Sequence, residues 1–152
     1  MRYLIVAAGS LKKGFYADGC SFYADRLSKV SAVTVDEVRE RQSDPTRRQA
    51  ETSAALLDRS EGWRRIALDE SGKQRSSEDL ADHLTQLENQ GISKISLLIG
   101  GADGHTDELR AAADELWSLS AMTLPHELAR LVLLEQLYRA ETIRAGHPYH
   151  RP

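Results

Sequence analysis

The sequence predicts an α/β fold, a mostly parallel sheet flanked by helices, and three observations support it. Short runs of apolar and β-branched residues alternate with longer segments in which apolar residues recur at helical spacing. The first run, residues 3–7, is apolar without interruption, which is typical of a strand buried on both faces. With 152 residues, 41% of them hydrophobic, the chain fits a single domain over residues 1–152.

Composition excludes several classes of protein. The 20 Lys and Arg residues stand against 23 Asp and Glu, so the net charge of −3 excludes a generally basic RNA-coating surface and leaves only local contacts with nucleic acid. Cys20 is the only cysteine, which excludes a disulfide framework and favours a small buried residue. The N-terminal apolar run is too short for a membrane span or a signal peptide, so we expect a cytoplasmic protein.

Elements in the first third of the chain follow from local patterns. Apolar residues at helical spacing predict a helix over 15–29, and a β-branched run predicts a strand over 32–35. Charged residues crowd 36–48, so we expect an exposed connection with solvated arginines, followed by a helix over 45–59.

The next elements are a strand and a well-marked helix. A brief strand is expected over 65–68, closed by a turn at Asp69–Gly72 because Asp, Ser and Gly favour turns. Ser76 is a typical helix-capping residue, and Gly91 is placed to end the helix that it begins. The apolar stripe of this helix consists of Leu80, Leu84 and Leu87.

The last third predicts two strands and two helices. A strand over 92–99 is expected to end in a glycine loop, 100–104, after which Thr106 caps a helix. The last strand is expected over 117–124, and the longest helix over 125–145, because Pro125 tolerates the missing N–H of a first helical turn. The stripe of this helix is wide enough to predict contact with a second subunit; it comprises Leu128, Leu131, Val132, Leu134, Leu137, Ala140 and Ile143.

Two strand ends are expected to lie side by side and form one ligand crevice. In the first, Gly100, Gly101 and Gly104 would let the backbone approach a ligand and offer it N–H groups. The spacing departs from the dinucleotide-binding signature, so this loop alone is equally typical of a plain tight turn. In the second, residues 119–124 alternate small hydroxyl and apolar side chains, which suit an adenine, although composition alone favours a buried strand.

The C-terminal tail carries histidines, but they do not predict a metal site. His126, His147 and His150 have no carboxylate or cysteine at a recognised ligand spacing. Aromatic and basic groups mixed in residues 147–152 instead suit stacking on a base and contact with phosphate. Arg139 could equally pair with Glu135, four residues before it on the same helix.

Several linked motifs together closely resemble the family of the ribosomal large-subunit methyltransferase H. They span nearly the whole chain and lie at Leu68–Lys73, Ser76–Glu78, Leu97–Gly104, Trp117–His126, Leu134–Ala140 and His147–Arg151. The family consists of minimal SPOUT methyltransferases that methylate N3 of a pseudouridine. The resemblance implies an α/β fold with a deep C-terminal trefoil knot, S-adenosylmethionine bound in the knot, and a homodimer whose interface helps to form each active site.

The resemblance also implies which residues act. Contacts to S-adenosylmethionine would come from Leu68, Gly101, Leu119, Ser120, Ala121, Met122, Thr123 and Leu124, with Gly100 and Gly104 shaping the loop. Tyr138, Arg139, Tyr149 and Arg151, with His147 and His150, would face RNA or the partner subunit. The resemblance does not identify the base that takes the N3 proton, and our own candidates are His147, His150 or solvent.

The implied substrate is a pseudouridine in 23S rRNA of the assembled ribosome, with no metal and no membrane involved. Two departures from the family stand out: His105 follows the glycine loop where an apolar residue is expected, and residues 31–48 look unusual but far from the motifs. Two other hypotheses remain. One is a non-catalytic ribosome- or RNA-binding factor with the same fold, and the other is a doubly wound nucleotide-binding enzyme.

Overall fold

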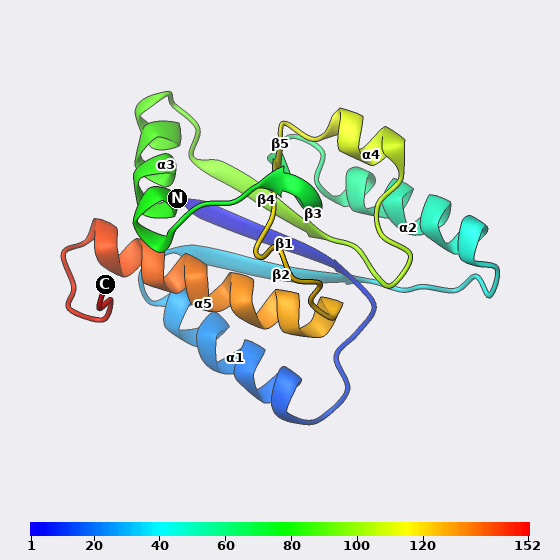
Figure 1. The fold of residues 1–152 in the computed structure, drawn as a ribbon, viewed down its shortest axis with the longest axis horizontal. Coiled ribbons are helices and arrows are strands. Elements are labelled where there is room, and N and C mark those ends of the chain that lie inside the picture. Colours follow the sequence, from blue (N-terminus) through cyan, green and yellow to red (C-terminus); the bar gives the residue numbers. More distant parts are fainter.

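Five parallel strands form one sheet in the order β2-β1-β4-β3-β5 (Figure 1). The computed structural model describes residues 1–152. The strands are β1 (Arg2–Ala8), β2 (Ala32–Val38), β3 (Arg64–Lys73), β4 (Lys94–Ile99) and β5 (Glu115–Trp117). The helices are α1 (Phe15–Ser28), α2 (Pro45–Arg59), α3 (Ser77–Asn89), α4 (Asp107–Ala112) and α5 (His126–Arg144). The predicted α/β fold class is confirmed, whereas the trefoil knot stays a prediction.

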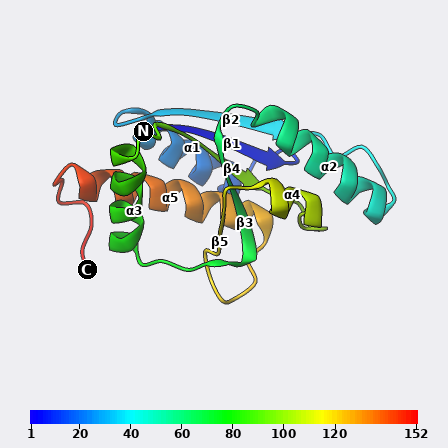
Figure 2. The same cartoon turned by 90° about the horizontal axis from the view of Figure 1, so that it is seen from above.

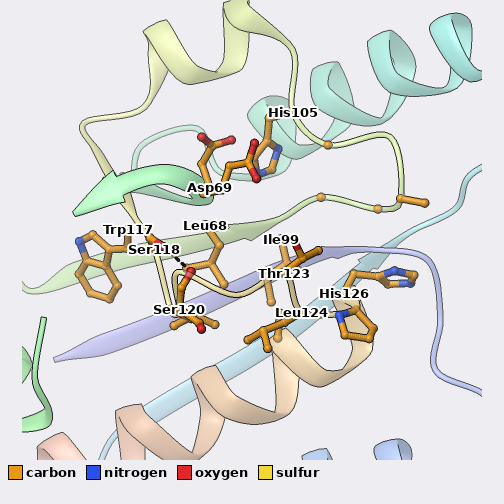
Figure 3. A pocket seen from close by; sticks show the side chains of 18 of the residues that line it. Leu68, Asp69, Ile99, His105, Trp117, Ser118, Ser120, Thr123, Leu124 and His126 are labelled. Atoms are coloured by element: carbon orange, nitrogen blue, oxygen red, sulfur yellow. Dashed lines mark hydrogen bonds between the residues drawn. The ribbon is translucent and has the colours of Figure 1, made fainter. Parts of the chain in front are cut away.

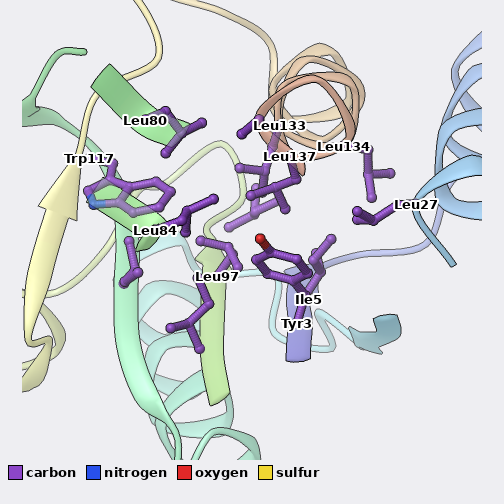
Figure 4. Packing of buried hydrophobic residues seen from close by; sticks show 14 of the residues in the cluster. Tyr3, Ile5, Leu27, Leu80, Leu84, Leu97, Trp117, Leu133, Leu134 and Leu137 are labelled. Atoms are coloured by element: carbon purple, nitrogen blue, oxygen red, sulfur yellow. The ribbon is translucent and has the colours of Figure 1, made fainter. Parts of the chain in front are cut away.

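Strand β1 is buried on both faces, as its unbroken apolar run predicts. Tyr3 and Ile5 point into the larger core cluster, which α1, α3 and α5 cover, and Figure 4 shows them packed with residues of these helices. Leu4 and Val6 point the other way, into a smaller cluster that α2 and α4 cover. Because side chains alternate along a strand, this single element joins the two halves of the core.

Three helices begin directly after residues that cap them, and two of these caps, Ser76 and Thr106, are the predicted ones. The side chains of Asp44, Ser76 and Thr106 accept hydrogen bonds from backbone N–H groups in the first turns of α2, α3 and α4. Helix α2 has the predicted bounds, and α5 begins one residue after Pro125, which serves as its N-cap. Both views of the fold place the C-terminal tail beside the end of α5 that is farthest from the β5–α5 loop (Figures 1 and 2). No helix is both long enough and apolar enough to traverse a bilayer.

The last strand was expected over 117–124, and this prediction is wrong. Strand β5 ends at Trp117, and residues 118–125 form an irregular loop. Its hydroxyls bond locally: Ser118 Oγ donates to the carbonyl of Ser120 (3.0 Å), and Ser120 Oγ accepts from the N–H of Met122 (2.9 Å). Local hydrogen bonds of this kind compete with the hydrogen bonds between paired strands. The alternating small hydroxyl residues therefore do not extend β5.

The turn expected at Asp69–Gly72 is also wrong. These residues belong to β3, which continues to Lys73 and pairs with β5 through a register shift after Leu68. Glycine is needed here for the close approach of two backbones and not for a turn, because a Cβ on Gly72 would lie 2.5 Å from the carbonyl carbon of Leu116. Strand β2 likewise runs three residues beyond its predicted end, to Val38.

The two expected ligand-binding strand ends are not neighbours. Strand β3 lies between β4 and β5, so the carboxyl ends of three strands face the same region. This arrangement brings Leu68, at the point where β3 leaves its regular pairing, between the glycine loop and the β5–α5 loop.

Candidate active site

A cleft of about 860 Å³ opens where β3, β4 and β5 end. Figure 3 shows side chains from the end of β3, the glycine loop and the β5–α5 loop surrounding it. The volume falls within the range of small-molecule sites, and the position outside parallel strand ends is where open α/β sheets bind ligands. All ten residues predicted to bind or shape a cofactor site line this cleft: Leu68, Gly100, Gly101, Gly104, Leu119, Ser120, Ala121, Met122, Thr123 and Leu124.

Two glycines of the glycine loop (100–104) have different surroundings. Gly104 has φ of +73°, a conformation that other residues rarely adopt. A Cβ on Gly101 would lie 2.7 Å from Oε1 of Glu40, so a side chain at this position requires the flexible Glu40 carboxylate to move. The Cβ of any substitution at Gly101 therefore meets Glu40 first.

Asp69 and Arg110 also line the cleft, and sequence reasoning missed both. The Asp69 carboxylate accepts hydrogen bonds from Nε of Arg110 (3.0 Å) and from the backbone N–H and hydroxyl of Ser71. Burial opposes ionisation, but these bonds outweigh it and hold the pKa of Asp69 below its ordinary value. The cleft therefore contains an ionised carboxylate whose charge is balanced by the Arg110 guanidinium. Because a turn was predicted at Asp69–Gly72, Asp69 was not predicted as a site residue.

His105 lies under the glycine loop with 2% of its surface exposed. Its ring is 3.2 Å from the place of a Cβ on Gly100, and neither ring nitrogen has a hydrogen-bond partner of good geometry. Burial lowers the pKa of His105 more than the nearby Asp69 carboxylate and the backbone groups of Leu68 and Leu98 raise it. The imidazole is therefore neutral at physiological pH and forms the floor of the cleft.

Replacing His105 with leucine should make the protein less sensitive to acid. Because the folded-state pKa of His105 is depressed, the unfolded chain binds a proton that the folded protein does not, and stability is lost as pH falls below about 6.5. Melting temperatures of both proteins from pH 7.5 to pH 5 test this. The acid-induced drop should be smaller in His105→Leu, and an equal drop in the two proteins would contradict the prediction.

Residues 31–48 are not far from the motifs, contrary to expectation. Glu40 lies beside Gly101. In addition, Nε of Arg48 donates to Oδ2 of Asp103 at 2.6 Å, and Nη2 of Arg48 donates to Oδ1 at 2.9 Å. Arg48 is thus paired rather than solvated, and the segment before α2 borders the glycine loop. Contacts of this kind join residues about 55 positions apart, which local patterns cannot reveal.

The structure does not bring the tail to the cleft of its own chain, since no residue from 138 onward lines it. His150 instead lies between Arg139 (3.0 Å) and Glu78 (2.8 Å), and the hydroxyl of Tyr149 donates to Glu135. The Tyr149 ring packs edge-on against Tyr138, while His147 and Arg151 are exposed.

Electrostatic contacts hold the tail in this position. The predicted Arg139–Glu135 ion pair is present at 2.6 Å. The hydrogen bond from His150 lowers the pKa of Glu78, while burial, with contributions from Tyr23 and Glu135, raises the pKa of Tyr149 well above its ordinary value. The tail thus forms a surface over α3 and α5, which we call the tail surface (residues 147–152 with Tyr138 and Arg139).

Comparison with known proteins identifies the family. The family described as "Predicted SPOUT methyltransferase" matches residues 1–150. A ribosomal RNA large subunit methyltransferase H from Deinococcus radiodurans is 45% identical, covering 99% of each chain, and one from Thermus thermophilus is 40% identical over the full length of both.

A solved structure, a probable methylase family protein from Haemophilus influenzae, has the same fold. Its TM-score is 0.56 at 11% identity, covering 99% of this chain and 70% of that one. The match over residues 1–150 and the identities of 40–45% over whole chains exceed what a shared fold alone produces. The chain belongs to the SPOUT methyltransferase family.

Proposed function

We propose that this protein methylates N3 of a pseudouridine in 23S rRNA of the assembled ribosome, using S-adenosylmethionine. The observation that carries the proposal is the cleft, in which all the residues expected to bind the methyl donor come together from three distant parts of the chain. The relatives of 40–45% identity that bear the name ribosomal RNA large subunit methyltransferase H support the choice of RNA. Ribosomes as substrate place the reaction in the cytoplasm.

The residues of the cleft fit S-adenosylmethionine. Leu119 and Leu124 are half-buried and supply apolar surface for an adenine, while the glycine loop leaves its backbone accessible at Gly100 and Gly101. The ionised Asp69, although paired with Arg110, keeps acceptor capacity for a ligand hydroxyl. When bound, the donor supplies an electrophilic methyl group on a positively charged sulfur.

The chain's own residues would orient the two reactants and receive a proton. Methylation of N3 requires the N3 proton to leave, and His147 and His150 are the proposed acceptors, with solvent as the other route. His150 could serve only after releasing Arg139, which occupies its Nδ1 lone pair. Tyr138, Arg139, Tyr149 and Arg151 would contact RNA by stacking and by phosphate binding. A net charge of −3 agrees with recognition through these local groups and the shape of the ribosome.

We place the reaction in a homodimer in which one subunit's tail surface faces the partner's cleft. Within one chain, the cleft lies at the start of α5, where Ala129 lines it, whereas Glu135, farther along the helix, holds Tyr149. Apolar side chains on α1 remain open for contact with a second copy, with Phe15 70% and Phe22 49% exposed. Such an arrangement would complete each active site from two chains.

Methyl transfer to ribosomes tests the function directly. Purified protein is incubated with methyl-labelled S-adenosylmethionine and with ribosomes from a strain that lacks the corresponding methyltransferase. We expect label in 23S rRNA at a pseudouridine, no label when ribosomes lacking pseudouridine are supplied, and little on free rRNA. Ribosome binding without transfer would instead identify a non-catalytic factor with this fold.

A further inference from the structure

Side chains of α2 hold the glycine loop from the side opposite the cleft. Arg48 forms a two-pronged pair with Asp103, at 2.6 and 2.9 Å. Nε2 of Gln49 donates to the carbonyl of Asp103 (2.8 Å) and to that of His105 (3.3 Å). One turn later, Oγ of the buried Ser53 accepts from the N–H of Thr106 at 3.1 Å. We call Arg48, Gln49 and Ser53 the α2 clamp.

The loop has little else to fix it. Between Gly100 and His105 its own backbone forms a single hydrogen bond, from the N–H of Gly104 to the carbonyl of Gly101. The His105 ring beneath it has no hydrogen-bond partner. The conformation of these six residues therefore depends on side chains that reach it from α2, a helix in the first half of the chain.

The α2 clamp does not touch the cleft. Neither Arg48, Gln49 nor Ser53 lines it, whereas the residues that they hold, Asp103 and His105, do. The Glu40 carboxylate also contacts the loop from this side, next to Gly101. Two-pronged guanidinium–carboxylate pairs fix both distance and angle, which suits the positioning of a ligand-binding loop.

We propose that the α2 clamp, and the Arg48–Asp103 pair above all, positions the glycine loop for S-adenosylmethionine, so that Arg48 sets the affinity of a ligand it does not contact. This proposal rests on the function proposed above. Small displacements of a binding loop cost affinity steeply, because the loop must then be reordered when the ligand binds.

The test is a double-mutant cycle on cofactor affinity. Dissociation constants for S-adenosylmethionine and S-adenosylhomocysteine are measured by calorimetric titration for wild type, Arg48→Ala, Asp103→Ala and the double variant. We expect Arg48→Ala to weaken binding about tenfold, and to have almost no further effect once Asp103 is alanine, because the two side chains act as one unit. Arg47→Ala, an exposed neighbour on the same helix with no side-chain partner, is the matched control and should bind like wild type.

Further variants separate positioning from general damage. Thermal melts are recorded for every variant, and titrations are run well below each melting temperature. Arg48→Lys, which keeps the charge but loses the two-pronged geometry, should recover only part of the affinity, and Gln49→Ala should weaken binding independently. Wild-type affinity in Arg48→Ala would overturn the positioning proposal. Failure of the wild-type protein to bind either ligand would instead overturn the proposed function.

Discussion

Gly72→Ala is expected to abolish cofactor binding and to destabilise the fold by about 3 kcal/mol, the upper end of the usual range for overpacking. The added Cβ would lie 2.5 Å from the carbonyl carbon of Leu116 and 2.6 Å from that of Trp117. Both neighbours are backbone atoms of β5, so no side chain can move aside to relieve the clash. Separation of β3 from β5 would displace Asp69 and the loop that follows Trp117, two walls of the cleft.

Denaturant unfolding and titration with S-adenosylmethionine measure the two effects of Gly72→Ala separately. Gly91→Ala is the control, because Gly91 has φ of +82° but no atom within 4 Å of an added Cβ. It should cost about 1 kcal/mol of backbone strain and leave cofactor affinity unchanged. Wild-type affinity in Gly72→Ala would show that the close crossing is not required for the cleft.

Removal of residues 147–152 should lower methyl transfer at least about 100-fold, the usual contribution of a positioned base, while cofactor binding is retained. Gly101→Trp should be equally inactive because Gly101 lines the cleft, and a tryptophan side chain there would fill the ligand site or displace the glycine loop. Each homodimer would then lack a different half of the active site.

Mixing the two inactive proteins decides whether an active site spans two subunits. After subunit exchange, half of the dimers carry one of each chain, and in these dimers an intact cleft meets an intact tail once, which restores about a quarter of wild-type activity. If each tail served its own cleft, no combination would contain a complete site. Activity that stays at the level of the separate variants would therefore contradict the proposed arrangement.

The helices were predictable because their signals are local. Asp44, Ser76 and Thr106 cap the turns that directly follow them, and α2 runs between its predicted bounds. Glycine was more ambiguous. At Gly72 its lack of a side chain serves a crossing of two strands, and sequence reasoning placed a turn there because a single sequence shows only which residues stand next to one another.

The residues expected to bind the cofactor follow from resemblance to a family, and all of them line a single cleft. Local patterns could not have supplied Asp69 with Arg110, or Arg48 with Asp103, since each pair joins residues 41 to 55 positions apart. The order of the strands, with β3 between β4 and β5, is also a property of the whole chain.

The third wall of the cleft, residues 117–129, completes a site whose other walls lie at 68–70 and 99–105. A nascent chain synthesised only as far as β5 therefore has a glycine loop but no enclosed ligand site. Ligand binding stabilises only the state that binds, so the methyl donor cannot stabilise a chain that ends at β5 and favours the finished chain alone. The ligand therefore adds stability only after the β5–α5 loop and α5 have folded.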